Sequence, residues 1–425
     1  MMLRLFTVVW LAVGSIVTAG ETDWPQWRGP NRDGHAAPQR LLQSWPEGGP
    51  KLLWTFDAAG TGYSSCSIVD GRLYTQGSDA GRCSAMCLDA ESGRELWRQD
   101  YGRTGTQDDY NQGWGGGPRS TPTVDGDTIA LMSDVGVLAV LDRDTGRIRW
   151  RYDFVEKYGS ETPYWGFSES PLIDGDRVVA TAGGDPFLVG FDRDTGRQVF
   201  ASEGVEAPPQ YASIVRGEIG RLPFYVTASK PGLFAFAADG GTKLFSDTAT
   251  GNKVAVIPTP IIVGDRLYHT SDYGAGNTLL RLSPTAGGVR AESVYHRNDK
   301  TMRNHHGGVV VVDDTVFGYS KVNGNVWMAQ DLTSGDVLWE HRIRPNKSGS
   351  IAFGDGRLYG YTDKDATVRL FEPSRTGWML RGELVLPRQT SAERDRGAIW
   401  SHPVIADGKL FVRDQELIFA YDIRR

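Results

Sequence analysis

Six segments of the chain share a pattern of two apolar runs separated by a short turn that is rich in Asp and Gly. They read SIVDGRLYTQG, PTVDGDTIALM, PLIDGDRVVAT, IIVGDRLYHTS, IAFGDGRLYGY and PVIADGKLFVR, and SIVRGEIGRLPFYVT and VVVDDTVFGYS are weaker copies. Each copy predicts a β-hairpin, because Gly accepts the positive φ that a two-residue hairpin turn requires. The eight turns are expected at Gly71, Gly126, Gly175, Gly217, Gly264, Asp314, Gly356 and Gly408.

A second turn follows the hairpin in most copies. LDAESGRELW, LDRDTGRIRW, FDRDTGRQVF, AADGGTKLF and QDLTSGDVLW each place an aromatic residue four positions after a Gly. We expect these aromatics to lie on the outermost strand of each unit, where they pack against the next unit; they are Trp97, Trp150, Phe200, Phe245 and Trp339. Two hairpins make four antiparallel strands, and four-stranded units that recur every 42 to 55 residues predict a β-propeller.

The number of blades follows from how the ring closes. The eighth unit ends at LIFAYDIRR and lacks a fourth strand, whereas KLLWTF, within Gly48–Asp57, precedes the first complete unit. Pairing this segment with the last blade leaves no open sheet edge between the ends of the chain. The sequence therefore predicts an all-β fold, an eight-bladed β-propeller of four-stranded antiparallel blades, over residues 48–425 and closed by an N-terminal strand.

The first residues are typical of an export signal. Arg4 precedes the apolar run LFTVVWLAVGSIV, which small residues follow. We predict a signal peptide over residues 1–20, an N-terminal extension over residues 21–47, and a periplasmic or secreted protein. The apolar run is too short for a membrane span, and the absence of a nearby Cys argues against a lipid anchor.

The net charge bears on the kind of partner, and the cysteine count bears on disulfides. A net charge of −6 gives no reason to expect nucleic acid or an anionic membrane surface as partner. Cys66, Cys83 and Cys87 are too few for a disulfide framework, so we expect small buried side chains. We expect a monomer.

The repeat resembles that of the PQQ-like, or quinoprotein-alcohol-dehydrogenase-like, β-propellers. DWPQWRGPNRDG (Asp23–Gly34), GGGPRSTP, WGFSESPL and NHHGG also resemble segments of secreted, planctomycete-type members. In members that are dehydrogenases, the quinone lies between a Trp and a disulfide of adjacent cysteines, beside a Ca²⁺ held by Glu, Asn and Asp. This chain has no adjacent cysteines, and no Asp accompanies Glu169 and Asn304 in the blade entries. We therefore predict neither a cofactor nor a metal site, with PQQ and Ca²⁺ kept as an alternative.

In a propeller the first strand of each blade lines the central channel, so the segments that enter these strands should meet at one end of the axis. Long loops, 102–116, 156–166 and 295–302, lead into three of these entries. The predicted funnel residues are Tyr63, Arg119, Trp165, Glu169, Tyr211, Arg303, Asn304, His305, His306, Lys347, Trp400 and His402.

Several roles are open to these side chains. The histidines of RNHHGG can bind a metal, act as acid or base, or hydrogen-bond a ligand or a neighbouring loop. Adjacent residues of a strand point to opposite sides, so we expect at most one of the pair to face the axis if the strand has already begun there. Arg119 and Glu169 either form an ion pair across blades or contact a ligand, and Trp165 and Trp400 either stack on a ligand or seal blade junctions. The candidates for catalysis are His305, His306, His402 and Glu169.

Three functions are compatible with these residues. The first is an exported propeller that binds a small molecule, a carbohydrate or a protein partner at its funnel, similar in role to outer-membrane assembly propellers. The second is a PQQ-dependent alcohol or sugar dehydrogenase. The third is a cofactor-free carbohydrate lyase or hydrolase, with His305 or His402 as base and Arg119 or Arg303 beside a substrate charge.

Overall fold

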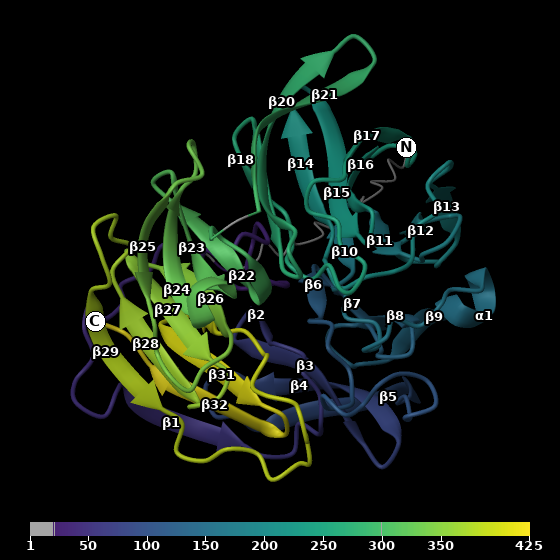
Figure 1. The fold of residues 1–425 in the computed structure, drawn as a ribbon. Coiled ribbons are helices and arrows are strands. Elements are labelled where there is room, and N and C mark those ends of the chain that lie inside the picture. Colours follow the sequence, from purple (N-terminus) through teal and green to yellow (C-terminus); the bar gives the residue numbers. More distant parts are fainter. Residues whose placement is uncertain (1–19, 21, 299) are drawn as a thin grey trace, which may run out of the picture.

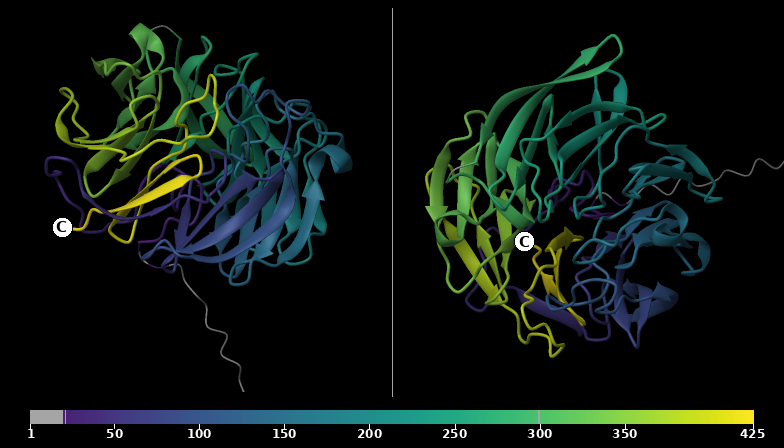
Figure 2. Two further views of the ribbon diagram at one scale, coloured as in Figure 1. Left: turned by 90° about the horizontal axis from the view of Figure 1, so that it is seen from below. Right: turned by 45° about the vertical axis from the view of Figure 1, so that its right-hand side comes forward.

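Eight four-stranded antiparallel sheets form a ring in the computed structural model, which describes residues 20, 22–298 and 300–425. Figure 1 shows the ring, and Figure 2 shows it from two further sides. The first strands of neighbouring blades, such as β2 and β6 or β26 and β30, lie against one another, so they surround the axis. The predicted eight-bladed propeller is confirmed.

Seven blades take their strands in sequence order, from the axis outward. Blades 1 and 2 contain β2 (Ser67–Val69), β3 (Arg72–Asp79), β4 (Arg82–Asp89) and β5 (Glu95–Arg103), then β6 (Thr123–Asp125), β7 (Thr128–Met132), β8 (Val137–Asp142) and β9 (Ile148–Asp153). Blades 3 and 4 contain β10 (Leu172–Asp174), β11 (Arg177–Thr181), β12 (Leu188–Asp192) and β13 (Gln198–Ala201), then β14 (Val215–Ile219), β15 (Leu222–Ser229), β16 (Gly232–Ala237) and β17 (Lys243–Asp247).

The ring continues in the same order through the second half of the chain. Blades 5 and 6 contain β18 (Ile261–Val263), β19 (Arg266–Ser271), β20 (Gly276–Thr285) and β21 (Gly288–Arg297), then β22 (Asn304–Val312), β23 (Thr315–Ser320), β24 (Val326–Asp331) and β25 (Val337–His341). Blades 7 and 8 contain β26 (Gly349–Gly354), β27 (Arg357–Thr362), β28 (Thr367–Phe371) and β29 (Leu380–Val385), then β30 (Val404–Ala406), β31 (Lys409–Asp414) and β32 (Leu417–Asp422), with β1 (Lys51–Phe56) outermost.

The N-terminal strand closes the ring as expected. β1 pairs antiparallel with β32, from Lys51 opposite Asp422 to Phe56 opposite Ile418. The two ends of the propeller are thereby hydrogen-bonded into one sheet, and the last blade has no missing strand.

Seven of the eight hairpin turns lie where the sequence places them, and one does not. Asp355 and Gly356 illustrate the turn chemistry, because both take positive φ, 47° and 76°. The turn predicted at Gly217 is wrong: Gly217 lies within β14, and the chain turns at Gly220 instead. The first strand of this blade is longer than that of most others, which moves its turn toward the second Gly of the segment.

The outer aromatic residues join neighbouring blades. The indole Nε1 of Trp97 donates a hydrogen bond to the carbonyl of Arg143 (3.2 Å), and that of Trp150 donates to the carbonyl of Arg193 (2.8 Å). Each acceptor lies in the second turn of the following blade, so the predicted packing of these aromatics is confirmed. The core is accordingly distributed between blades, with small and aliphatic side chains of β7 and β8 packed against those of β11 and β12.

Helical structure is minor in the described residues. It consists of α1 (Phe154–Tyr158), which occupies the start of the predicted loop 156–166, and the short 3-10 helix η1 (Val322–Gly324). Neither these helices nor any other part of the described chain has the length and apolar character of a membrane-crossing helix. The predicted signal peptide lies outside the described residues except for Gly20. Cys66, Cys83 and Cys87 are free and buried, and the last two share β4.

The N-terminal segment, residues 22–47, lies across the first strands of the blades. Trp24 pairs with Ile68 of blade 1 through two backbone hydrogen bonds of 2.9 Å, and the backbone N–H of Ala36 donates to Phe353 of blade 7 (2.8 Å). Between these points, Arg32 donates to the carbonyls of Ser170 (2.9 Å) and Ile214 (2.8 Å), in blades 3 and 4. In the right-hand view of Figure 2 this purple segment lies inside the ring. The segment therefore closes one end of the channel.

Candidate functional site

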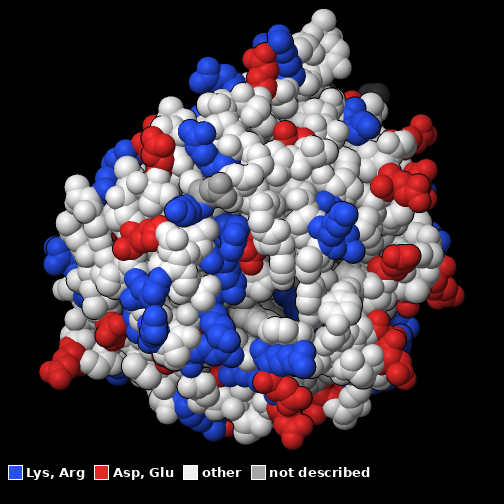
Figure 3. All heavy atoms as spheres, viewed as in Figure 1, with Lys and Arg blue, Asp and Glu red and all other residues white. Residues whose placement is uncertain are grey.

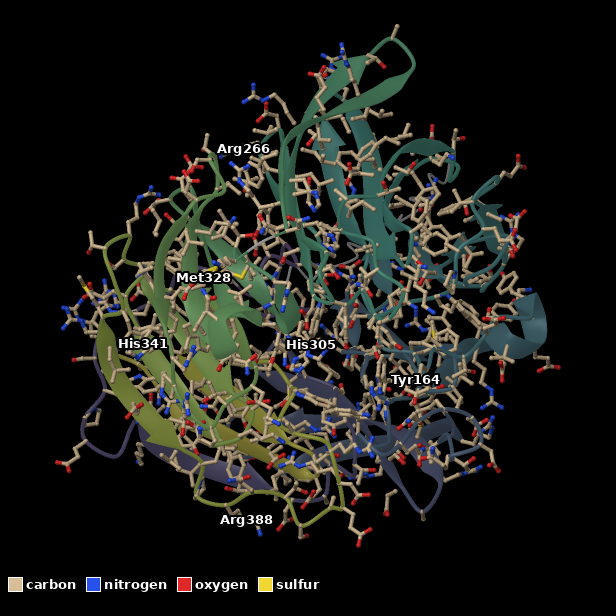
Figure 4. The ribbon with its side chains drawn as sticks, viewed as in Figure 1. Tyr164, Arg266, His305, Met328, His341 and Arg388 are labelled. Atoms are coloured by element: carbon tan, nitrogen blue, oxygen red, sulfur yellow. The ribbon has the colours of Figure 1, made fainter. Side chains whose placement is uncertain are left out.

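The entries of the blades converge on one cavity at the axis, the central chamber, with a volume of about 170 Å³. Figure 4 places His305 near the middle of the ring, whereas Arg266 and Arg388 lie at its periphery. Every blade entry except that of blade 7 contributes at least one side chain. The lining residues are Trp27, Tyr63, Trp114, Arg119, Trp165, Ser168, Tyr211, Ile257, Tyr273, His305, His306, Trp400 and His402.

Most of the predicted funnel residues meet in this chamber. Those that line it are Tyr63, Arg119, Trp165, Tyr211, His305, His306, Trp400 and His402. Lys347 lines a second cavity, the side chamber, which has a volume of about 420 Å³ and shares Trp114, His305, His306 and Trp400 with the first. Three predicted residues, Glu169, Arg303 and Asn304, line neither chamber.

These three side chains are held by the protein itself. The buried amide of Asn304 donates to the carbonyls of Gly308 and Tyr319, both at 3.0 Å, and its oxygen accepts from the N–H of Gly308. Glu169 is buried and accepts hydrogen bonds from the backbone and hydroxyl of Thr181. Arg303 forms an ion pair with Asp272 (3.0 Å). Spacing along the chain placed them at the entries but could not show which way they point.

Both adjacent histidines line the chamber although β22 has begun at Asn304, so the expectation that at most one faces the axis once the strand has begun is wrong. Their ring centroids are 4.7 Å apart. β22 departs from regular pairing here, because Asn304 lies opposite Ser320 whereas the next pair is Val309 with Gly318. The extra residues form a bulge, which Gly308 permits with a φ of +68°. Alternation along a regular strand therefore does not apply to His305 and His306.

Burial keeps the three chamber histidines neutral. It lowers the pKa of His305 and of His402 to about 3, and it lowers the pKa of His306 well below the usual range. The cationic Lys321 depresses the pKa of His305 further, and Arg28 does the same for His402. Because His402 Nε2 lies 3.3 Å from the carbonyl of His306, the neutral ring donates from Nε2. These imidazoles present hydrogen-bonding atoms rather than charge.

Aromatic rings form the walls of the chamber. The indoles of Trp114 and Trp400 are stacked with centroids 6.1 Å apart, and Tyr63 lies 5.2 Å from Trp400. On another wall, the Trp165 and Tyr211 rings are 6.0 Å apart. Trp165 and Trp400 thus both line the cavity, where a ligand can contact them.

Arg119 does not pair with Glu169, which excludes the ion pair considered from the sequence. Its guanidinium donates instead to the carbonyls of Gly115 (2.6 Å) and Gly117 (2.8 Å). It also lies 5.4 Å from the centre of the Tyr63 ring, in cation–π contact. Arg119 therefore brings an uncompensated positive charge to the chamber wall.

The sequence-based set missed Trp27, Trp114 and Tyr273, as well as the smaller Ser168 and Ile257. Trp114 belongs to the loop 102–116, which stood out in the sequence for its length but not for any one residue. Trp27 belongs to the N-terminal segment, where its Nε1 donates to Thr259 Oγ1 (2.9 Å). Its place in the motif DWPQWRGPNRDG was the only sequence signal for it, and that motif gave no position in space.

Two buried arginines of the N-terminal segment lie beneath the chamber. Arg28 donates to the carbonyl of Val309 and leaves Nε and Nη1 buried without a partner among the described residues. Arg32 is 2 % exposed, and burial lowers its pKa to about 9. The pKa of the buried Glu169 is raised to about 7 by its removal from water, although Arg32 acts to lower it. The end of the channel closed by this segment therefore carries positive charge.

The side chains that could contact a quinone or bind Ca²⁺ are not arranged as they are in the dehydrogenases. Cys66, Cys83 and Cys87 are on or beside blade 1 strands, and none of them lines the chamber. Glu169 and Asn304 are committed to protein partners and do not reach the cavity. Across the described residues, no group of three or more His, Cys, Asp or Glu side chains is placed to hold a metal ion. The side chains present therefore do not fit this cofactor site.

Comparisons with known proteins agree with the fold. BamB from Moraxella catarrhalis has 15 % identity and a TM-score of 0.57, over 82 % of this chain and 95 % of that one. The quinohemoprotein alcohol dehydrogenase from Comamonas testosteroni has 11 % identity and a TM-score of 0.67, over 95 % and 80 % of the two chains. A europium-containing methanol dehydrogenase has 12 % identity and a TM-score of 0.67, over 92 % and 89 %. At these identities the likeness shows the fold alone.

No curated protein matches the sequence. A family model described as outer membrane protein assembly factor BamB matches residues 81–377, which is more than half of the chain. The match runs from the turn before β4 of blade 1 to the segment before β29 of blade 7, so it contains all of blades 2 to 6. The chain therefore belongs to this BamB-like family of PQQ-like β-propellers.

Proposed function

We propose that the protein is an exported binding propeller, which holds a carbohydrate in its central chamber without a redox cofactor. The observation that carries the proposal is the convergence of side chains from seven blade entries and the N-terminal segment on one aromatic-walled cavity. Binding sites of this kind are concave and largely apolar, with a few polar groups that fix orientation.

The chamber offers both of the surfaces that a sugar presents. Its indole and phenol rings match the apolar faces of a pyranose. Two polar groups of the chamber can hydrogen-bond a ligand. The hydroxyl of Tyr211 accepts a hydrogen bond from the backbone N–H of Trp165 (3.3 Å) and still has its own proton to donate. His306 Nε2 has no partner among the described residues and can accept or donate, depending on the tautomer. Sugar hydroxyls both donate and accept, so one ligand type satisfies both.

A second candidate function is cofactor-free catalysis on a carbohydrate. It is favoured by the pairing of Tyr273 with His305, whose hydroxyl oxygen and Nε2 lie 2.9 Å apart at the chamber wall. A group with a pKa of about 3 is, however, a weak base near neutral pH. Binding is therefore the better-supported function, and the appearance of new oligosaccharide ends on incubation, lost in His305→Ala, is the result that would favour catalysis.

If the protein is exported, its ligand lies outside the cytoplasm. The proposal rests on the positively charged start, the apolar run and the small residues of the first 20 positions. Expression of the full chain in a bacterial host, followed by fractionation and mass measurement, tests it. Recovery of a chain shortened by about 20 residues outside the cytoplasm supports export, and recovery of the intact chain in the cytoplasm contradicts it.

Binding is tested by titrating neutral oligosaccharides while indole fluorescence is recorded. Trp400→Ala removes a chamber wall and should abolish the response to any saccharide that binds. Trp339→Ala is the matched control, because it also removes one indole but from the blade junction at β25. Equal responses of the two folded variants, or no response of the parent protein to any saccharide, neutral or acidic, would contradict the proposal.

A further inference from the structure

We propose that the ligand is an acidic saccharide, whose anionic group lies in the side chamber while its ring stacks in the central chamber. This inference rests on the proposed function and specifies its ligand class. The lining residues of the side chamber are Trp114, His305, His306, Lys321, Lys347, Ser348, Asp363, Lys364, Asp395, Arg396, Ala398 and Trp400. Figure 3 shows Lys and Arg side chains gathered around the hollow on this face.

The cations of the side chamber lack carboxylate partners. Lys321, Lys347, Lys364 and Arg396 form no ion pair within the described part of the chain, and only Lys364 donates to a protein acceptor, the carbonyl of Gly397 (3.0 Å). Two neighbouring arginines are neutralised, because Arg303 pairs with Asp272 (3.0 Å) and Arg394 with Asp414 (2.5 Å). The side chamber therefore brings together four cations without an ion pair among the described residues, in a chain whose net charge is −6, and Arg119 adds a fifth at the wall of the central chamber.

The carboxylates of the same cavity offset only part of this charge. The side chain of Asp363 accepts the backbone N–H of Lys347 (2.9 Å) and forms no ion pair with the lysines of the cavity. Asp395 is exposed at the rim. Two carboxylates face four cations, and an anion placed between them gains charge-assisted hydrogen bonds.

Lys321 is the residue best placed to receive the anion. It follows β23, is half-buried beside His305 and His306, and has no acceptor for its ammonium group among the described residues. Burial lowers the pKa of Lys321, and Asp272 and Asp363 act to raise it without forming an ion pair with it. An anionic ligand group would supply the direct counter-charge that a partly desolvated cation needs. Lys347 and Arg396 are more exposed and extend the positive surface toward solvent.

The two chambers adjoin, because they share lining residues. Trp114, Trp400, His305 and His306 line both cavities. A sugar ring against the stacked indoles therefore has its substituents directed toward the cations. Either a uronic acid carboxylate or a sulfate ester supplies the negative charge, and hydroxyls of the same ring satisfy the polar atoms of the central chamber.

The test compares acidic oligosaccharides with neutral partners of the same backbone. A galacturonate trimer is titrated beside its methyl ester, and a sulfated galactan oligosaccharide beside its desulfated form, by calorimetry at low and high salt. We expect at least one acid to bind about ten-fold or more tightly than its neutral partner, with the difference reduced by salt. The pair that shows the difference identifies the anion as carboxylate or sulfate.

Variants then locate the anion. Lys321→Met keeps the length of the stem and should lower affinity for the acid about ten-fold more than it lowers affinity for the neutral partner. Lys51→Met, on the exposed face of β1, is the matched control and should change neither. Lys347→Met is a second variant at the exposed side of the cavity, in case Lys321→Met does not fold.

The outcomes separate this inference from the proposed function. If neutral and acidic partners bind equally, or Lys321→Met and Lys347→Met both retain the full preference for the acid, the acidic-ligand inference is overturned and carbohydrate binding stands. If neither kind of saccharide binds the folded parent protein, both are overturned.

Discussion

The indole of Trp27 packs on the imidazole of His402, with ring centroids 4.3 Å apart and an interplanar angle of 59°. Trp27 belongs to the N-terminal segment and His402 to the entry of the last blade, so the two ends of the propeller chain meet at the chamber. The N-terminal segment is thus a wall of the site as well as a closure of the channel. This contact makes the stability of the segment relevant to ligand binding.

Arg32 should contribute strongly to the stability of the fold. It is buried and donates to the carbonyls of Ser170, Pro171 and Ile214. Arg32→Met leaves those carbonyls without their donor and removes the positive charge that acts on Glu169. We expect the free energy of unfolding in urea to fall by about 3 kcal/mol.

Arg40→Met is the control for this change, since Arg40 lies in the same segment but is exposed. It should alter the free energy of unfolding by less than about 0.5 kcal/mol. A loss of stability in Arg32→Met no larger than that of Arg40→Met would show that the segment is not held at the axis by this guanidinium.

Gly308→Ala should disturb the floor of the chamber as well as the bulge. A Cβ at this position would lie 2.1 Å from Arg28 Nη1, at a φ of +68°. Gly175 has a similar φ of +61° and open space around its Cα, so Gly175→Ala measures the backbone cost alone. We expect Gly308→Ala to be destabilised by about 1–3 kcal/mol more than Gly175→Ala, measured by urea unfolding. Equal losses would mean that Arg28 does not occupy the space beside Gly308.

His402 should make stability depend on pH. Its pKa is about 3 in the folded protein and close to 6.5 when unfolded, so between these values the unfolded state binds the additional proton. Stability therefore falls as the pH is lowered from about 6.5, by at most about 1.4 kcal/mol per pH unit for one group. His402→Gln should remove this contribution, so its free energy of unfolding should fall less steeply between pH 6 and pH 4.

The comparison between variants isolates His402 from other titrating groups. His305 and His306 act in the same direction, whereas Glu169, with a pKa raised to about 7, favours the folded state as pH falls from 7 toward 4.5. His296→Gln replaces an exposed histidine and should follow the parent curve. Identical slopes for His402→Gln and the parent protein would contradict the burial of this imidazole.

The three thiols should be unreactive in the native protein. Burial raises the pKa of Cys66 to about 11 and that of Cys87 to about 12, and it also raises the pKa of Cys83. Because the thiolate is the reactive form, a disulfide reagent at pH 8 should modify none of them within minutes. In urea all three should react, and rapid reaction of any thiol in the folded protein would contradict its placement.

Much of the fold could be predicted because its determinants are local and repeated. A turn of Asp355 and Gly356 needs only its own residues to take positive φ, and an aromatic at Trp97 needs only a following blade of the same kind. A ring then forms because each blade buries its apolar face against the next blade. The turn wrongly predicted at Gly217 shows where local prediction fails. Two glycines in this segment could each form a turn, and the length of β14 places the turn at the second, Gly220.

The sequence by itself determined the propeller, its closure by β1 and the meeting of the blade entries at the axis, because hairpin turns and repeat spacing fix these features residue by residue. Tertiary structure alone decided which side chains face the cavity: the bulge at Gly308 turns both His305 and His306 inward, and hydrogen bonds turn Glu169 and Asn304 away. It also decided that Trp27 enters the chamber and that Lys321 lies beside the histidines. Side-chain direction and charge clustering depend on contacts between distant segments, which no local pattern records.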